Sequence, residues 1–246
     1  MKPVIHVVAN LEELSRATAT EFVRQVQEAV QAKGAFTVAL SGGSTPKNLY
    51  ALLADDTALR TTIPWDKVHF FWGDERHVPP DHPDSNYRMA HEALLSKVPV
   101  LPANVHRIKS EYPEANHAAD EYEQTLREFF GLAAGRFPRF DLLLLGMGPD
   151  GHTASLFPGT VALHESARLV VANWVEEFRA YRITLTPPVL NNAASIIFLV
   201  SGEEKAETLR AVLQGEEQPE HFPSQSINPA QGTVLWLVDQ SAARLL

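Results

Sequence analysis

A histidine at the end of a glycine-rich turn is the residue best placed to carry acid–base chemistry. His152 closes the stretch GMGPDG at residues 146–151, which follows four consecutive leucines at 142–145. A short apolar run bounded by glycine is typical of a strand buried on both faces of a parallel sheet. The turn would therefore set His152 at the carboxyl end of that strand, where open α/β sheets bind ligands and an imidazole can exchange protons near neutral pH.

A second turn has the composition of an anion-binding loop. The stretch SGGSTP at 41–46 follows an apolar strand and leads into a helix, for which Thr45 is the predicted N-cap and Pro46 the first helical residue. Backbone N–H groups, hydroxyls and a positive helix end all favour an anion. No Gly-Lys-Ser/Thr sequence closes the turn, so it is not a Walker A loop. On these residues alone, phosphate binding and an ordinary capped turn both remain open.

Charged residues stand near the ends of three other predicted elements. Asp74 and Arg76 lie in a charged loop expected at 73–80, directly after an apolar strand at 68–72, where charges are costly unless they face a cleft or solvent. Arg182 stands at the start of a strand and Lys205 opens a helix. Each cation is either part of an anion site or a plain surface charge.

Other motif-based chemistries fit the sequence less well. Gly146-x-Gly148-x-x-Gly151 matches the dinucleotide fingerprint, but Pro158 and Gly159 end any helix after little more than one turn, and the fingerprint needs a full crossover helix. The loop DHPD at 81–84 could suggest a metal, yet such residues in one proline-rich loop are usually surface. The serine-hydrolase and zinc-protease signatures Gly-x-Ser-x-Gly and His-Glu-x-x-His are missing. We expect neither a metal nor an organic cofactor.

Composition limits the class of protein. A chain of 246 residues that is 45% hydrophobic can bury a large core, and we expect one domain over residues 1–246. The net charge of −9 argues against nucleic-acid and anionic-membrane partners, because both need a basic surface. Without cysteine there is no disulfide, Cys-ligated zinc or thiol nucleophile. No signal-peptide pattern or membrane-length apolar run is visible, so we expect a cytoplasmic protein.

The apolar segments predict a scaffold in which strands and helices alternate. Residues 105–108 are expected as a short strand and residues 215–229 as a surface loop. The alternation predicts an α/β layered fold with a mainly parallel sheet. The predicted strands are 4–9, 36–40, 68–72, 142–145, 168–175, 181–185, 195–200 and 234–238, and the predicted helices are 11–33, 47–54, 86–97, 113–130, 187–193, 203–213 and from 241 onward.

Taken in order, these motifs resemble the glucosamine-6-phosphate isomerase/6-phosphogluconolactonase family essentially from end to end. The resemblance implies a Rossmann-like α/β fold shared with ribose-5-phosphate isomerases, hydrolysis of 6-phospho-D-glucono-1,5-lactone to 6-phosphogluconate, and no cofactor. It is carried by SGGSTP at 41–46, WGDER at 72–76, GMGPDGHTASLFPG at 146–159, Arg182-Ile183-Thr184, and Ser201-Gly202 through Lys205.

The resemblance also implies roles for individual residues. His152 is the general base that takes a proton from the attacking water, and Arg76 contacts the substrate or steadies negative charge. Asp74 and Asp150 orient His152 or bind sugar hydroxyls. The implied partner is a small sugar phosphate, bound by a monomer or weak homodimer. The implied phosphate ligands are Gly42, Gly43, Ser44, Thr45, Arg182 and Lys205.

Two competing functions have distinct sequence signals. In the deaminase/isomerase branch of the family, the Asp-Gly-His stretch continues to a glutamate beside Pro-Gly. Here residues 153–159 read TASLFPG without a carboxylate, which favours the lactonase. A catalytically silent sugar-phosphate sensor is the second alternative, and an intact His152 beside intact cations argues against it.

Overall fold

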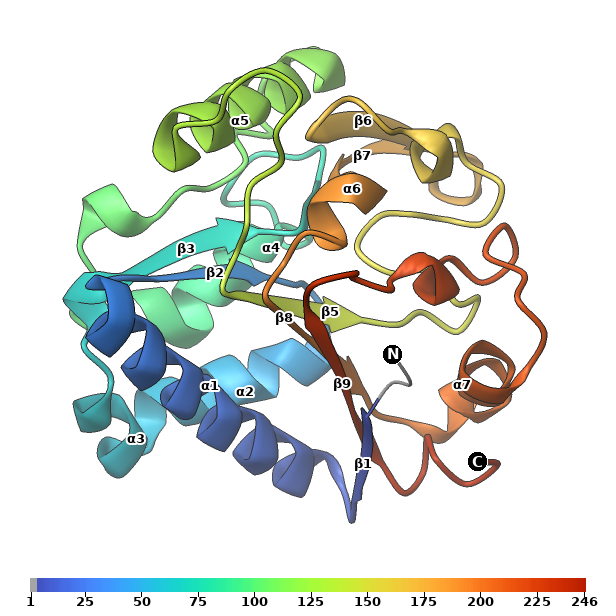
Figure 1. Cartoon of the computed structure of the whole chain (residues 1–246), viewed down its shortest axis with the longest axis horizontal. Helices are drawn as coiled ribbons and strands as arrows, with labels where there is room; N and C mark the ends of the chain where they lie inside the picture. Colours follow the sequence, from blue (N-terminus) through green and yellow to red (C-terminus); the bar gives the residue numbers. More distant parts are fainter. Residues whose placement is uncertain (1–3) are drawn as a thin grey trace.

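A parallel sheet of six strands forms the centre of the molecule (Figure 1). The structure is a computed structural model and describes residues 4–246. Every pair of neighbouring strands runs parallel, which confirms the predicted α/β fold with a mainly parallel sheet. In spatial order the strands are β1 (Val4–Val8), β9 (Thr233–Asp239), β8 (Ser195–Val200), β5 (Leu142–Gly146), β2 (Phe36–Leu40) and β3 (Val68–Trp72).

The middle strands are apolar along their length because other elements cover both of their faces. The four leucines 142–145 are buried, as are residues 36–40 of β2 and 196–200 of β8. Phe198 stacks on Trp236 of the next strand with ring centroids 3.8 Å apart. Burial of this apolar area, worth about 25 cal/mol per Å², makes the sheet a rigid base for the loops that leave its carboxyl edge.

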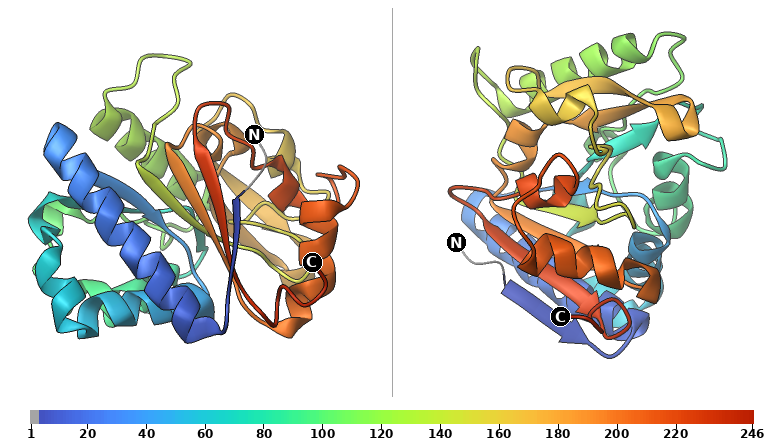
Figure 2. Two further views of the ribbon diagram at one scale, coloured as in Figure 1. Left: turned by 60° about the horizontal axis from the view of Figure 1, so that its bottom comes forward. Right: turned by 90° about the vertical axis from the view of Figure 1, so that its right-hand side faces the viewer.

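Helices α1 (Leu11–Lys33) and α2 (Ser44–Asp55) lie along one face of the central sheet, with α3 (Thr57–Thr62) beside them (Figure 2). The side chain of Asn10 caps α1 by accepting a hydrogen bond from the Glu13 N–H at 3.0 Å. The cap and a buried apolar stripe at helical spacing explain why the bounds of α1 are those predicted from the sequence.

A second, antiparallel sheet lies away from α1 and α2, beside helix α5 (Ala115–Phe130) in Figure 1. Its strands are β4 (Asp74–Arg76), β7 (Ala180–Leu185) and β6 (Val170–Val175). The prediction that residues 73–80 form only a loop is therefore wrong. β4 forms because its backbone groups pair with those of β7. Its side chains are charged and show no strand pattern, so the sequence did not predict it.

Two predicted helices are shorter in the structure. The helix expected at 86–97 is α4 (Asn86–Ala90), continued by one π-helical segment, His91–Leu95. The helix expected at 187–193 is α6 (Pro187–Leu190). After α6, Asn191 Nδ2 donates to the carbonyls of Pro187 and Ser226, a contact with a distant loop that local propensity does not report.

Toward the C-terminus, the helix expected at 203–213 consists of a 3₁₀ turn, Glu203–Lys205, followed by α7 (Ala206–Gln214). Residues 241–245 form turns rather than the predicted helix, since so short a segment cannot compensate the cost of helix nucleation. Within residues 4–246, no helix has the length and apolarity needed to cross a bilayer.

Two irregular segments also differ from expectation. Of residues 105–108, only Val105 forms a bridge, with Phe70. The segment 215–229, expected as a surface loop, contains a 3₁₀ turn at Pro223–Ser226, and Ser224 is buried there. Its hydroxyl and N–H both donate to the Gly151 carbonyl, so this loop supports the turn that carries His152.

The order of strands brings the two predicted functional turns together. The chain passes from β2 outward to β3, and later enters β5 on the opposite side of β2 before continuing to β8 and β9. The loops that leave β2 and β5 therefore diverge from adjacent strands. Such a switch point at the carboxyl edge of an open parallel sheet is where ligands bind.

Candidate active site

A cleft of about 240 Å³ opens at the switch point. Residues 41–46 after β2 and 146–149 after β5 form its walls, so the two turns singled out in the sequence face one space. Asp150 and Arg182 are not part of its lining but adjoin residues that are. The charged and titratable side chains that line it are Asp74, Arg76, His152 and Lys205.

His152 and Asp150 form a hydrogen-bonded pair at the mouth of the turn after β5. The distance from His152 Nδ1 to Asp150 Oδ1 is 2.6 Å, and the His152 N–H donates to the same oxygen at 3.2 Å. Burial opposes ionisation of Asp150, but the bonds from His152 outweigh it and lower the pKa of this carboxyl. An ionised Asp150 accepts a hydrogen bond from Nδ1–H of the neutral ring, which leaves Nε2 free to accept a proton.

Packing fixes the orientation of the His152 ring. Phe157 stacks on it with ring centroids 4.1 Å apart and an interplanar angle of 28°. On the backbone side, a Cβ at Gly148 would collide with the ring and with Asp150. Glycine is therefore required at position 148 to let the turn approach the imidazole so closely.

The turn after β2 offers backbone groups at the start of α2. Gly43 has φ of 101°, which L side chains rarely adopt, and the helix begins at Ser44. The prediction that Thr45 caps this helix is wrong. Gly43 is the N-cap residue and no side chain caps the helix, because Thr45 already lies within the first turn. The first N–H groups of α2 are thus not taken by a cap.

Asp74 occupies the floor of the cleft and is held from two sides. Its Oδ2 accepts a hydrogen bond from Ser155 Oγ at 2.6 Å, and its backbone carbonyl accepts one from Asn86 Nδ2 at 3.0 Å. Ser155 belongs to the same loop as His152, and Ala154 between them has a left-handed φ of 48°. This loop is therefore tied to Asp74 across 81 residues of sequence, with local backbone strain at the site.

Glu75 is buried and ties the end of β4 to the start of α4. Its carboxyl accepts hydrogen bonds from the N–H groups of Arg76, Asn86 and Tyr87 and from the hydroxyl of Ser85. Burial raises the pKa of Glu75 to about 7, while these N–H groups act in the opposite direction. Glu75 does not line the cleft, and its bonds hold the backbone beside Asp74 and Arg76, which do.

Arg76 and Arg182 face each other across the antiparallel pair of β4 and β7. Within residues 4–246 neither guanidinium has a carboxylate at ion-pair distance; Arg76 donates to the Asp84 carbonyl, and Arg182 lies over the Phe178 ring. Burial and then the charge of Arg76 lower the pKa of Arg182. Like charges directly opposite are destabilising, so the pair is suited to an anion that neutralises both.

Lys205 reaches the cleft from the turn before α7. Burial lowers the pKa of its amine, against the attraction of Glu204 and Asp239. No ion-pair partner for Lys205 occurs in the described part of the chain. With Arg76 on another wall, it gives an otherwise acidic protein a local positive field.

Residues 4–246 contain no group of three or more His, Asp or Glu side chains arranged to hold a metal ion. His82 and Asp84 lie near one another in an exposed loop, 3.7 Å apart.

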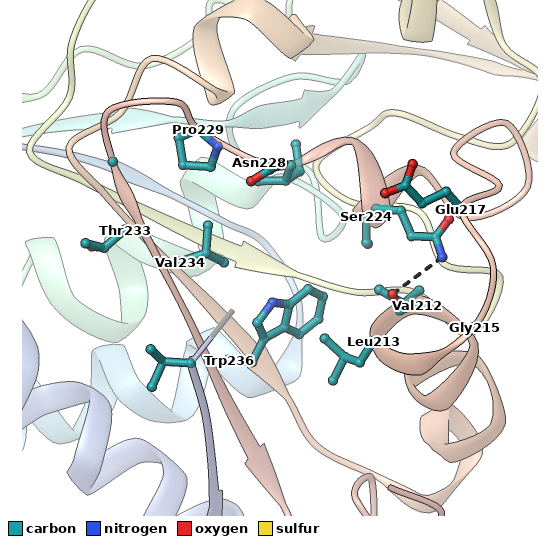
Figure 3. Close-up of a pocket in the computed structure, with 14 residues that line it drawn as sticks. Val212, Leu213, Gly215, Glu217, Ser224, Asn228, Pro229, Thr233, Val234 and Trp236 are labelled. Atoms are coloured by element: carbon teal, nitrogen blue, oxygen red, sulfur yellow. Dashed lines mark hydrogen bonds between the residues drawn. The ribbon is translucent and has the colours of Figure 1, made fainter. Parts of the chain in front are cut away.

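A larger cavity lies elsewhere and lacks this chemistry. It measures about 520 Å³ and is bordered by Val212, Leu213, Val234 and Trp236 (Figure 3). Glu217 is the charged residue of its lining, which has no histidine, lysine or arginine. We therefore assign the chemistry to the smaller cleft, where a histidine–carboxylate pair and cations meet.

Asn86 and Ser41 are cleft residues that sequence reasoning missed. Asn86 lies against Gly42, since a Cβ at Gly42 would collide with its side-chain oxygen. Asn86 is the first residue of α4, directly after the N-cap Ser85. A polar residue at a helix start is common, so there was no reason in the sequence to place Asn86 in the cleft. Ser41 opens the predicted turn 41–46 but was not among the expected phosphate ligands, and its buried Oγ has no hydrogen-bond partner within residues 4–246.

The fold is that of an α/β enzyme, and its cleft at the switch point of the parallel sheet brings together a histidine–carboxylate pair and two cations, a combination suited to acid–base chemistry on a small anion. Residues 9–236 match the family described as glucosamine-6-phosphate isomerases/6-phosphogluconolactonase, and the chain belongs to this family.

Relatives match over the full length. A 6-phosphogluconolactonase of Synechocystis sp. is 42% identical over 246 residues, which cover 100% of this chain and 99% of the relative. The structure of the 6-phosphogluconolactonase of Trypanosoma brucei superposes with a TM-score of 0.86 at 32% identity, covering 100% of this chain and 99% of the other. A monomeric glucosamine-6-phosphate deaminase shares the fold, with a TM-score of 0.80 at 23% identity over both whole chains.

Proposed function

We propose that this protein hydrolyses 6-phospho-D-glucono-1,5-lactone to 6-phosphogluconate, a step of the oxidative pentose phosphate pathway. The observation that carries the proposal is the His152–Asp150 pair facing the anion-binding turn 41–46 across one cleft. Membership of the family and full-length similarity to 6-phosphogluconolactonases give the substrate.

In the proposed mechanism, His152 acts as general base. With its Nδ1 proton held by Asp150, Nε2 takes a proton from water as the water oxygen attacks the lactone carbonyl carbon. The carbonyl electrons move to oxygen, and Arg76 stabilises the resulting oxyanion. The intermediate then collapses by breaking the bond between the carbonyl carbon and the ring oxygen. The protonated His152 returns its proton to that oxygen, which yields the open-chain acid.

The phosphate is proposed to lie on the turn after β2. Gly42, Gly43, Ser44 and Thr45 present N–H and hydroxyl groups, and Lys205 adds a charge-assisted bond. Arg182, which lies opposite Arg76, is proposed to add a further positive charge beside the phosphate. Asp74, held by Ser155, is proposed to accept a hydrogen bond from a sugar hydroxyl.

Deamination of glucosamine 6-phosphate is the alternative within this family. The segment 153–159 supplies no carboxylate beside His152, and its Ser155 is already bonded to Asp74. We further propose that the chain forms a single domain and works in the cytoplasm as a monomer or weak homodimer. It needs no nucleic-acid partner, consistent with the net charge of −9.

Two parallel assays test the proposed function. Acid release from freshly prepared 6-phosphogluconolactone, corrected for spontaneous hydrolysis, should be fast. Ammonia release from glucosamine 6-phosphate should be absent. Ammonia release without lactone hydrolysis would assign the deaminase function instead. Stabilisation by 6-phosphogluconate in a thermal-shift experiment, with neither reaction, would indicate a sugar-phosphate sensor.

A further inference from the structure

Two fully buried tyrosines form hydrogen bonds to the backbone at the ends of β2 and β3, the strands from which two of the cleft loops depart. Tyr50 of α2 lies against Ser41, the residue after β2, and Tyr122 of α5 lies against Trp72, the last residue of β3. Both phenol rings are completely buried, and neither lines the cleft. Neither tyrosine takes part in the mechanism proposed above.

Each phenol oxygen forms the same pair of hydrogen bonds with one backbone residue. The Ser41 N–H donates to Tyr50 Oη at 3.1 Å, and Tyr50 Oη donates to the Ser41 carbonyl at 2.9 Å. The Trp72 N–H donates to Tyr122 Oη at 2.9 Å, and Tyr122 Oη donates to the Trp72 carbonyl at 3.0 Å. Burial raises the pKa of both tyrosines, which keeps each hydroxyl neutral and able to donate and accept together.

These bonds replace a missing neighbouring strand. The register between β2 and β5 covers only Val38 and Ala39, so it stops before Ser41. On the other strand, β3 is the edge of the sheet, and its outer partner is a single bridge between Phe70 and Val105. At both places a buried backbone N–H and C=O would otherwise be unpaired.

The residues held in this way directly precede two different segments of the cleft wall. Ser41 is followed directly by the glycines of the anion-binding turn. Trp72 stands two residues before Asp74 and four before Arg76. The Gly73 N–H also donates to the Leu40 carbonyl at 2.9 Å, and neither tyrosine takes part in this bond between β2 and β3. Each phenol bonds only its own residue, so the loss of one phenol oxygen should loosen one set of cleft groups while the ladder between the strands keeps the other in place.

We propose that Tyr50 and Tyr122 are positioning residues with separate tasks. Tyr50 holds the turn 42–45, which binds the substrate phosphate. Tyr122 holds the segment 73–76, which places Asp74 and Arg76 at the reacting centre. This division of tasks rests on the proposed lactonase function, whereas the positioning of each loop does not.

The test compares three Tyr→Phe variants that each remove one oxygen. For Tyr50→Phe we expect KM for the phosphorylated lactone and the inhibition constant of 6-phosphogluconate to rise about five- to twentyfold, with kcat within about twofold. For Tyr122→Phe we expect kcat to fall about five- to twentyfold, with the inhibition constant nearly unchanged. Tyr112→Phe is the matched control, because the Tyr112 hydroxyl has no hydrogen-bond partner within residues 4–246.

Amide hydrogen exchange supplies a readout that does not depend on activity. Tyr50→Phe should speed exchange at residues 41–45 and leave 72–76 unchanged, and Tyr122→Phe should do the reverse. If the unaltered protein fails to hydrolyse the lactone, the proposed function falls, while this exchange pattern still decides the positioning roles. Equal losses of kcat/KM on phosphorylated and unphosphorylated lactone in both variants, or exchange that rises uniformly over the chain, would overturn the inference in favour of general structural roles.

Discussion

Lys205 and Arg182 are the two cationic side chains among the proposed phosphate ligands, and their surroundings differ. Lys205 lines the cleft without an ion-pair partner in the described part of the chain, whereas Arg182 lies beside Arg76 and over Phe178. A charge-assisted hydrogen bond to phosphate contributes about 1.5–3 kcal/mol. Removal of either cation should therefore weaken binding of the phosphorylated substrate rather than slow the chemical step.

We predict that Lys205→Ala and Arg182→Ala each lower kcat/KM for the phosphorylated lactone by roughly ten- to a hundredfold. Activity on unphosphorylated gluconolactone should change little. The comparison of both substrates for each variant measures this, with exposed Lys67→Ala as the control. Equal losses on the two lactones would mean that the altered residue is not a phosphate ligand.

At this scale, the sequence located the reactive groups better than their supports. His152, Asp150 and Asp74 could be named because titratable residues in a glycine-rich turn or after a strand stand out. Asn86 and Ser155 could not, because a small polar residue near a helix start or in a loop is common, and its bond to Asp74 spans distant segments.

The turn between β2 and α2 is the element on which phosphate recognition depends. We predict that Gly43→Val raises KM for the phosphorylated lactone and weakens inhibition by 6-phosphogluconate at least tenfold, since valine cannot adopt φ of 101° without moving the turn. Kinetics on purified, folded protein measure this effect. The Cβ itself has space, so the strain lies in the backbone alone.

Gly135→Val is the matched control for that strain. Gly135 has φ of 72° and lies in an exposed loop with open space around it, so its replacement carries a similar backbone cost far from the cleft. It should lower stability while leaving KM unchanged. Normal inhibition of folded Gly43→Val by 6-phosphogluconate would contradict the role given to this turn.

Long apolar and helical patterns fixed most element positions, as the matching bounds of α1, β2, β3 and β8 illustrate. The wrong predictions lie where contacts between distant segments determine whether an element forms. The strand β4 is polar and is defined only by pairing with β7, more than a hundred residues later. Helix α2 begins at Ser44, earlier than predicted, because Gly43 and not Thr45 is its N-cap residue.

For the whole molecule, one partly buried and one buried group, His106 and Glu75, make stability depend on pH in opposite directions. Burial, with a smaller effect of His69, lowers the pKa of His106 to about 4, so this group stabilises the fold above the unfolded value near 6.5 and loses that contribution as pH falls toward 4. Burial raises the pKa of Glu75 to about 7, so its contribution is present at low pH and lost as pH rises toward 7.

We predict that His106→Phe removes the acid-side loss. The ring stacks on Phe71 at 4.4 Å, which phenylalanine can reproduce, while the contact of His106 Nε2 with His69 Nδ1 at 3.3 Å disappears. Relative to the parent, the variant should gain about 1–2 kcal/mol of unfolding free energy between pH 6.5 and 4, a figure reduced for partial exposure. Urea unfolding at several pH values measures this. A difference between variant and parent that stays constant over that range would show that His106 does not titrate as stated.

The fold class follows from sequence at the scale of the whole chain, because alternating strands and helices admit few topologies. The position of the cleft follows as well once the turns after β2 and β5 are known to leave adjacent strands. The second sheet and the support that residues 215–229 give to the His152 turn do not follow, because both depend on contacts between segments whose own patterns are irregular.

The most direct test of the account is the turnover of His152→Gln. Glutamine keeps similar bulk and hydrogen-bonding capacity but cannot take up the proton of the attacking water. We predict that kcat for 6-phosphogluconolactone falls by on the order of 10²–10⁴, after subtraction of spontaneous hydrolysis, with affinity for 6-phosphogluconate nearly unchanged. His164→Gln, at an exposed position, should keep full activity. Near-normal kcat in folded His152→Gln would contradict the assignment of the general base, and Asp74 would be the next residue to replace.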